Sequence, residues 1–187
     1  VVYRETIEKE GEGSAVFDKE ISGQRHFAKV TLKLIPLERG SKNKFISEVT
    51  QETIPDIFIP AIEKGVMESL ESGSLMGYPV VDVKAILTGG AFKESLGTEL
   101  AYTVSASMAC KTALANGEPF LLDPIMNVEI FVPEAFMGDV IGDLNSRKGK
   151  IESIAHKMDA LVIKAIVPLA RMFGYSCLLY TSDAADE

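Results

Sequence analysis

Residues 59–98 read IPAIEKGVMESLESGSLMGYPVVDVKAILTGGAFKESLGT, and this stretch decides how the chain around it folds. Apolar residues recur at three- and four-residue steps in its first part and share one face of a predicted helix: Ile59, Ile62, Val66 and Leu70. Two glycines and Pro79 then end that helix. The apolar, β-branched residues 80–87 predict a buried strand. A Gly-Gly loop over residues 88–98 leads to a second helix.

The composition is that of a globular protein. The chain has 187 residues, of which 47% are hydrophobic and 25% are charged. No apolar run approaches the ~20 residues that span a bilayer, so we expect no membrane contact. Cys110 and Cys177 fit no metal spacing, and no leader sequence is evident, which predicts a reduced, cytoplasmic protein. The net charge of −8 argues against bulk coating of nucleic acid but allows local basic loops.

Short strands and polar turns precede the quoted stretch. We predict strands at residues 1–6, 14–20, 28–35 and 44–49, with turns at 8–14, 22–26 and 36–41. In the third strand Val30, Leu32 and Leu34 share one face. Thr31 and Lys33 share the other, as in a sheet with one solvated face.

A second helix is predicted from residue 99 to about residue 115. Thr98 is its expected N-cap, and Asn116-Gly117 ends it. Its apolar stripe is predicted to be Leu100, Val104 and Met108. Residues 119–123 are interpreted as a short connector.

The remaining chain has the order strand, helix, strand, strand, helix. The first strand is predicted from the alternation of Val128, Ile130 and Val132. The first helix is predicted from the helical spacing of Phe136, Val140 and Leu144. Residues 151–156 and 161–167 are predicted strands, and Pro168 opens a short helix over 169–175. This β-α-β-β-α order is one strand short of the β-α-β-β-α-β split unit. Residues 176–187 are interpreted as a foreign tail, and residue 1 as a cut from a longer chain.

Motifs for nucleotide and metal chemistry are absent from the sequence. It contains no G-x-x-x-x-G-K-[ST], G-x-G-x-x-G, H-E-x-x-H or C-x-x-C. Asp139 and Asp143 could form a carboxylate pair, although a solvated helix face is favoured. Cys110 is predicted to be a small buried residue, and His156 a solvated turn residue. We therefore expect no metal, no catalytic residue and no cofactor within these residues.

Basic and aromatic residues gather in two predicted loops. Cations beside aromatic or imidazole rings can combine phosphate contact with base stacking. For His26, surface or RNA contact is favoured over catalysis. The candidate RNA-contacting residues are Gln24, Arg25, His26 and Lys29 in one loop, and Phe92 and Lys93 in the other.

Six motifs follow one another along the chain. They are YRET at residues 3–6, PAIEKG at 60–65, GYPVVDV at 77–83, LDPIM at 122–126, MGDVIGDLNSRKG at 137–149 and VPLARMFGY at 167–175. With these motifs the chain resembles translational elongation factor G, in unbroken order over residues 1–175.

The resemblance implies an α+β protein with two domains. Residues 1–120 would be the family's fourth domain, a ribosomal-protein-like β-α-β fold with a left-handed crossover. Residues 121–175 would be the fifth domain, ferredoxin-like and truncated before its last strand. The open sheet edge could pair with a second copy, although a monomer is expected. The full-length protein would be a ribosome-dependent GTPase promoting tRNA–mRNA translocation, with GTP and Mg²⁺ in a separate N-terminal domain.

The resemblance also implies where the ribosome is contacted. The tip of the fourth domain would enter the decoding site and touch the codon–anticodon duplex, and the six loop residues named above are the tip candidates. The fifth domain would lie near large-subunit rRNA, with Arg147 and Lys148 as weaker candidates. The implied partners are rRNA of both subunits and the tRNA–mRNA complex.

Both tip loops depart from the family's pattern. The family's S-G-G-R-G-Q-Y-G-H is matched by ISGQRHFAK at residues 21–29. Its G-S-Y-H-x-V-D-S-S-E is matched by GAFKESLGTE at 90–99, where Lys93 replaces the histidine. Lysine keeps a positive donor but lacks imidazole stacking and titration near neutral pH. A paralogue serving ribosome recycling or ribosome protection therefore stays open.

Two functions of other classes are also open. Small-molecule kinases use sheets with the same crossover, but they need a glycine- and serine-rich phosphate loop at a helix start. The nearest match, residues 71–74 (ESGS), lies at a predicted helix end. A plain interaction module is the second alternative.

Overall fold

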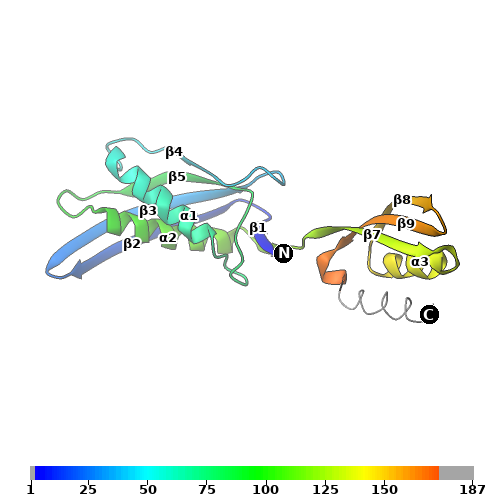
Figure 1. Ribbon diagram of the computed structural model, residues 1–187. Coiled ribbons are helices and arrows are strands. Elements are labelled where there is room, and N and C mark those ends of the chain that lie inside the picture. The colour runs from blue at the N-terminus through cyan, green and yellow to red at the C-terminus, as the bar shows by residue number, and fades with distance from the viewer. Residues whose placement is uncertain (1–2, 173–187) are drawn as a thin grey trace. The chain divides into compact units, whose positions relative to one another are not determined.

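The computed structural model describes residues 3–172, which divide between Leu122 and Asp123 into two compact units (Figure 1). The N-terminal unit contains β1 (Arg4–Ile7), β2 (Gly11–Ile21), β3 (Gln24–Pro36), β4 (Lys44–Ser47), η1 (Asp56–Phe58), α1 (Ile59–Leu70), β5 (Val83–Ala91), α2 (Glu99–Asn116) and β6 (Pro119–Leu122). The C-terminal unit contains β7 (Ile125–Pro133), η2 (Glu134–Phe136), α3 (Met137–Ser146), β8 (Lys150–Lys157), β9 (Ala160–Pro168) and η3 (Leu169–Arg171). The two-domain α+β prediction is confirmed. The predicted tail, residues 176–187, lies outside the described residues.

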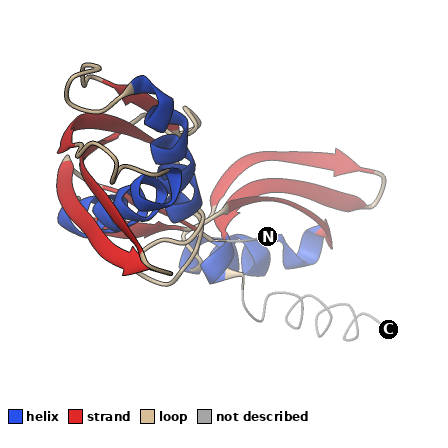
Figure 2. Cartoon of the chain, turned by 90° about the vertical axis from the view of Figure 1, so that its left-hand side faces the viewer, coloured by secondary structure: helices blue, strands red, loops and turns tan. Residues whose placement is uncertain are grey.

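The main sheet of the N-terminal unit has the order β2-β3-β5-β4. β4 and β5 are parallel, so α1 forms the crossover of a β-α-β unit, while the other pairs are antiparallel. Both long helices lie on one face of this sheet (Figures 1 and 2). Val30, Leu32 and Leu34 on that face are fully buried, as predicted. Residues 29, 31 and 33 point the other way, to a face that we call the open face.

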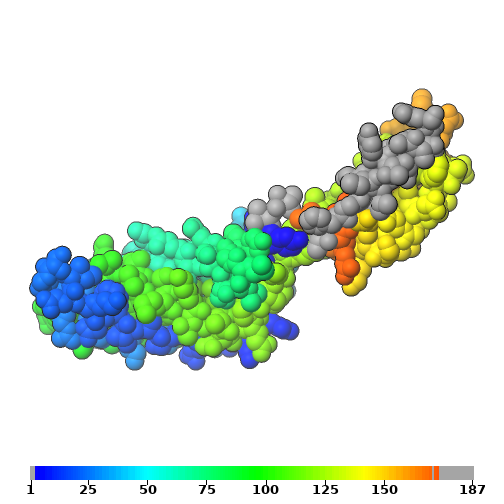
Figure 3. Space-filling model, turned by 90° about the horizontal axis from the view of Figure 1, so that it is seen from below, coloured from blue at the N-terminus to red at the C-terminus, as the bar shows by residue number. Residues whose placement is uncertain are grey.

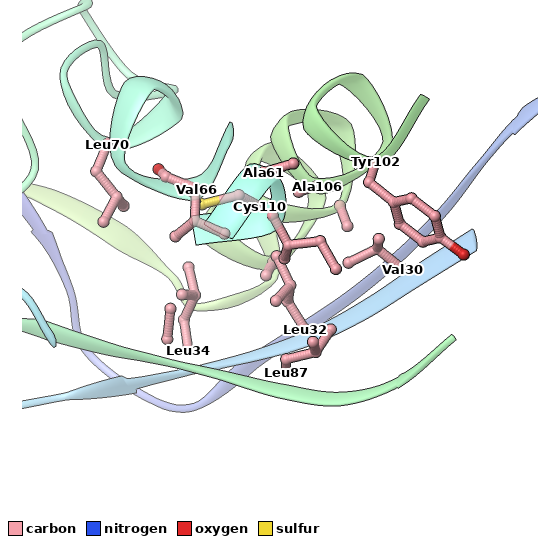
Figure 4. Packing of buried hydrophobic residues seen from close by; sticks show 14 of the residues in the cluster. Val30, Leu32, Leu34, Ala61, Val66, Leu70, Leu87, Tyr102, Ala106 and Cys110 are labelled. Carbon is pink, nitrogen blue, oxygen red and sulfur yellow. Dashed lines mark hydrogen bonds between the residues drawn. The ribbon is translucent and has the colours of Figure 1, made fainter. Parts of the chain in front are cut away.

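The core lies between this sheet and the two helices (Figure 4). The predicted helix at 59–70 is confirmed, with Ile62, Val66 and Leu70 buried against the sheet and α2. None of the helices between residues 3 and 172 is both long and apolar enough to cross a membrane.

The predicted apolar stripe of α2 is wrong at two of its three positions, since only Val104 packs, partly buried, against the core. Leu100 is 48% exposed and Met108 46%, and the buried face instead consists mainly of small residues: Ala101, Tyr102, Ser105, Ala106, Ala109, Cys110, Ala113 and Leu114. The reason is close approach on two sides. A Cβ on Gly13 of β2 would collide with the Ala109 carbonyl, and a Cβ on Gly65 of α1 with that of Thr103. Small side chains are therefore required along α2, and Cys110 is buried as predicted.

Several strands are longer than predicted because partner strands, which one segment cannot reveal, decide their extent. β2 begins at Gly11 within a predicted turn, and β3 begins at Gln24 within a predicted loop. β5 continues through the predicted Gly-Gly loop to Ala91 beside β3, next to a register shift at Thr31, where glycine is common. The predicted connector is a strand, β6, that pairs with β1.

The C-terminal unit is a three-stranded antiparallel sheet, order β7-β9-β8 among the described residues, with α3 on one face. The predicted alternation in β7 is confirmed, since Ile130 and Val132 are buried and Val128 is half-buried. Leu144 of α3 is fully buried against this face. The observed order, strand, helix, strand, strand, is the first part of the predicted ferredoxin-like unit.

Candidate nucleic-acid interface

A two-residue turn ends the long hairpin of β2 and β3. Ile21 pairs with Gln24, leaving Ser22 and Gly23 as the turn, with φ of 53° and 80°. Positive φ at both central positions matches the right-handed twist of a hairpin, which explains the glycine. The hairpin residues are blue in Figure 3, where they form one end of the N-terminal unit. Ser22, Gly23, Gln24 and Arg25 are all exposed.

The loop between β5 and α2, residues 92–98, is fastened to this hairpin. The Phe27 N–H donates to the Leu96 carbonyl at 2.8 Å. The loop also folds back on itself, because the N–H groups of Leu96 and Gly97 both donate to the Lys93 carbonyl at 3.1 Å. We call the hairpin end, residues 18–29, together with residues 92–98 the tip.

Aromatic packing connects the tip to the core. The Phe92 ring lies 5.8 Å from the Phe58 ring, centroid to centroid, and Phe58 stacks on Tyr102 at 4.8 Å. Tyr102 is fully buried, and its hydroxyl donates to the Ala91 carbonyl at 2.9 Å. The predicted contact residue Phe92 therefore has a packing role and is only half exposed.

His26 also has a structural role within the tip. The sequence placed it in a polar loop, which is wrong: it lies in β3 on the helix side and is 9% exposed. Its Nδ1 is 2.7 Å from the Thr98 hydroxyl oxygen, and that oxygen accepts the Ala101 N–H at 3.2 Å as the N-cap of α2. One hydroxyl group thus joins the hairpin to the start of α2.

Charged groups lie on the open face of the tip. The Arg25 guanidinium donates to both carboxylate oxygens of Asp18, at 3.0 and 2.9 Å. This hydrogen bonding to Arg25 lowers the pKa of Asp18 below its ordinary value, and the charge of Lys93 contributes in the same direction. The Lys93 ammonium lies 4.2 Å from the centroid of the Phe27 ring, a cation–π contact. Arg25 stays 54% exposed, so its guanidinium can still reach a ligand.

The structure brings most of the predicted tip residues together and separates them by role. Gln24, Arg25, Lys29 and Lys93 are exposed, whereas His26 and Phe92 fasten the loops. Sequence reasoning missed Asp18 as the partner of Arg25. The only signal for it was hairpin pairing, which places Asp18 opposite Phe27, two residues from Arg25.

The weaker candidates lie in the C-terminal unit. Arg147 is 14% exposed, and its guanidinium donates to Asp143 at 2.9 Å and to the Arg171 carbonyl at 2.7 Å. It therefore ties the end of α3 to η3. Lys148, with a φ of 57°, is exposed.

The loop directly after residues 71–74, the segment that the kinase alternative requires, already holds a carboxylate. Glu5 is 1% exposed and accepts N–H groups from Leu75 at 3.0 Å, Met76 at 3.0 Å and Tyr78 at 2.9 Å. The Glu5 carboxylate also lies against Gly73, so an anion already occupies the place beside residues 71–74 that a phosphate would take. The geometry therefore disfavours a nucleotide site here.

Comparison with known proteins gives matches over nearly the whole chain. The family described as "Elongation factor G, domain IV" matches residues 1–118, and "Elongation factor G C-terminus" matches residues 120–182. The chain is 44% identical to an elongation factor G of Aquifex pyrophilus and 42% identical to an elongation factor G 2 of Desulfotalea psychrophila. Each match covers 96% of this chain and 26% of the relative, so the chain spans about a quarter of their length.

A solved structure is similar as well. A crystal structure of a protein from Thermus thermophilus matches with a TM-score of 0.82 and 36% identity, over 95% of this chain and 26% of that one.

Proposed function

This chain belongs to the elongation factor G family, and from that premise we propose that it is the ribosome-contacting C-terminal part of a translational GTPase that promotes tRNA–mRNA translocation. The tip is its working end. It meets RNA at the decoding site through Gln24, Arg25, Lys29 and Lys93 and carries out no bond chemistry of its own.

The hydrogen bonding between the hairpin and the loop of the tip is the observation that supports this proposal. Two segments about seventy residues apart are held together by the Phe27–Leu96 hydrogen bond and by the pair His26–Thr98. Exposed cations on this rigid end suit contact with phosphate oxygens. The Phe27 ring beneath Lys93 fixes the direction of that ammonium group.

Other properties of the parent protein follow from the family as proposals. GTP and Mg²⁺ would bind in a part of the parent that these 187 residues do not include. The partners would be the tRNA–mRNA complex and rRNA of both subunits, with Lys148 the exposed candidate on the C-terminal unit. The parent would act in the cytoplasm.

A second function is favoured by one feature of the tip. Lys93, which replaces the histidine of the family's pattern, is held over Phe27, so its ammonium offers charge but no stacking ring. A paralogue that promotes ribosome recycling, or protects ribosomes, would need less readout of the codon–anticodon duplex. Recycling is therefore the alternative to translocation.

Charge reversal at the tip tests the proposal. We expect Lys93→Glu in the full-length factor to slow translocation, or recycling if the alternative holds, by at least tenfold. Lys111→Glu makes the same charge change at an exposed position of α2 and is the matched control. Unchanged rates of both reactions in Lys93→Glu would contradict the proposed role of the tip.

A further inference from the structure

Three lysines gather at the opposite end of the sheet from the tip: Lys42, Lys44 and Lys84. Lys84 of β5 lies between the fully buried Val83 and Ala85, so its side chain points to the open face. In the parallel ladder Lys44 of β4 is directly opposite Lys84, and Lys42 is exposed two residues earlier. Lys84 pairs with Ile35, ten residues along β3 from Arg25, which is roughly 33 Å at ~3.3 Å per residue. We call these three residues the lysine cluster.

The loop before β4, which carries Lys42, is anchored by a buried carboxylate. Asp82 is 4% exposed, and it accepts the Lys42 N–H at 3.1 Å and the Arg39 guanidinium at 3.2 Å. Lys42 and Asp82 have positive φ, 67° and 58°. Non-glycine residues keep such conformations where the surrounding contacts require them, and such sites are often functional.

A neighbouring amide holds the same loop a second time. The Asn43 side chain donates to the Val80 carbonyl at 2.7 Å and accepts the Val83 N–H at 3.1 Å. Residues 42 and 43 before β4 are thus hydrogen-bonded to residues 80–83, and these bonds hold the strand that carries Lys44 beside the strand that carries Lys84.

The charge arrangement within the cluster is unfavourable without a ligand. Lys44 and Lys84 are partners in the parallel ladder of β4 and β5, and two like charges on neighbouring strands repel each other. Within residues 3–172 no carboxylate forms an ion pair with any of the three. Lys33, on the same open face, is by contrast 3.1 Å from Glu10. A concentrated positive site on a chain of net charge −8 is complementary to a polyanion.

We propose that the lysine cluster binds the phosphate backbone of RNA, as a second contact separate from the tip. Ammonium groups act as point charges toward phosphate oxygens, and the cluster has no aromatic ring on which a base could stack. Binding is therefore independent of sequence and fixes the orientation of the N-terminal unit against its RNA. This inference rests on the proposed function, because the RNA is ribosomal.

The salt dependence of ribosome binding tests the inference. The probe is the full-length factor with vacant ribosomes and a non-hydrolysable GTP analogue, titrated at several salt concentrations. Loss of two phosphate contacts should reduce the slope of log K against log[salt] by about 1.4 to 1.8. We expect that reduction in Lys44→Gln/Lys84→Gln. The double variant Lys64→Gln/Lys111→Gln removes two exposed lysines from the helix side and should keep the wild-type slope.

The outcomes separate this inference from the proposed function. If the wild-type factor does not bind ribosomes, the proposed function fails, and this inference fails with it. If the wild type binds and Lys44→Gln/Lys84→Gln keeps its slope, only the lysine cluster is refuted. A photoreactive benzoyl-phenylalanine in place of Lys44 identifies the partner: cross-links to rRNA support the proposal, and cross-links to ribosomal protein alone overturn it.

Discussion

The hydroxyl group of Thr98 should decide whether the tip holds together. It accepts the Ala101 N–H as the N-cap of α2 and lies 2.7 Å from Nδ1 of the buried His26. Thr98→Val keeps the shape of the side chain but removes both interactions. Loss of an N-cap costs about 1 kcal/mol, and leaving a buried ring nitrogen without its partner costs about 1–3 kcal/mol. We therefore expect the N-terminal unit to lose about 2–4 kcal/mol of stability.

Native-state hydrogen exchange measures this loss where it occurs. The buried amides of α2 report the free energy of opening the unit, and the Phe27 amide, which donates to Leu96, reports opening of the tip. Both free energies should fall in Thr98→Val, and the tip should open at least as easily as the helix. This assay distinguishes the two units, since each amide is followed separately.

Thr98→Ser is the matched control, because serine keeps the hydroxyl group and serves equally well as an N-cap. It should stay within about 0.5 kcal/mol of the wild type, as an ordinary surface change would. If Thr98→Val and Thr98→Ser give the same exchange free energies, the Thr98 hydroxyl group does not hold the hairpin to the start of α2.

Three further predictions follow from buried and paired groups. Glu5→Gln should lower the free energy of unfolding in urea by about 1–3 kcal/mol, because at least one of the three N–H groups that Glu5 binds then faces an amide NH₂ group. The control Glu8→Gln, at an exposed position, should change that free energy little. Equal losses in the two variants would refute the role of Glu5. Arg25→Ala should raise the pKa of Asp18 toward its ordinary value in an NMR titration. Because folding lowers that pKa, the stabilising effect of the pair is present at neutral pH and is lost as pH falls through the folded-state pKa; an unchanged pKa in Arg25→Ala would contradict the ion pair. Burial raises the pKa of the Cys110 thiol to about 11, so a thiol reagent at neutral pH should modify Cys110 only after unfolding, which peptide mass spectrometry checks.

The sequence was sufficient for elements with a strong contrast between two faces. The helix at 59–70 and the strand around Ile130 each have one apolar and one polar side, and such contrast is what periodicity detects. It gave the extent and the N-cap of α2 correctly but failed for the buried face of that helix, whose backbone lies close to Gly13 on one side and to Gly65 on the other. Small residues carry little hydropathy, so the longer side chains of Leu100 and Met108 were mistaken for the buried face.

The tip could be predicted as a set of residues but not as a geometry. Arg25 and Lys93 were identified from their residue types and from the family resemblance. Their partners, Asp18 and Phe27, depend on the hairpin register and on the loop after β5, which lies about seventy residues away in the sequence. The pairing of β2 with β3 also explains why His26, predicted to lie in a loop, is a buried strand residue that makes a hydrogen bond. Long-range register is set by the whole fold, so local sequence patterns do not contain it.

Contact between the tip and decoding-site RNA is tested most directly by local cleavage from the hairpin turn. Gln24→Cys in the full-length factor, with every other exposed cysteine replaced by Ser, would carry a tethered iron chelate, while the buried Cys110 stays unlabelled. On the ribosome, hydroxyl radicals from position 24 should cut small-subunit rRNA at the decoding site. The same chelate on Lys111→Cys should give a different pattern. Identical patterns from the two positions, or cuts in large-subunit rRNA alone, would contradict the placement of the tip.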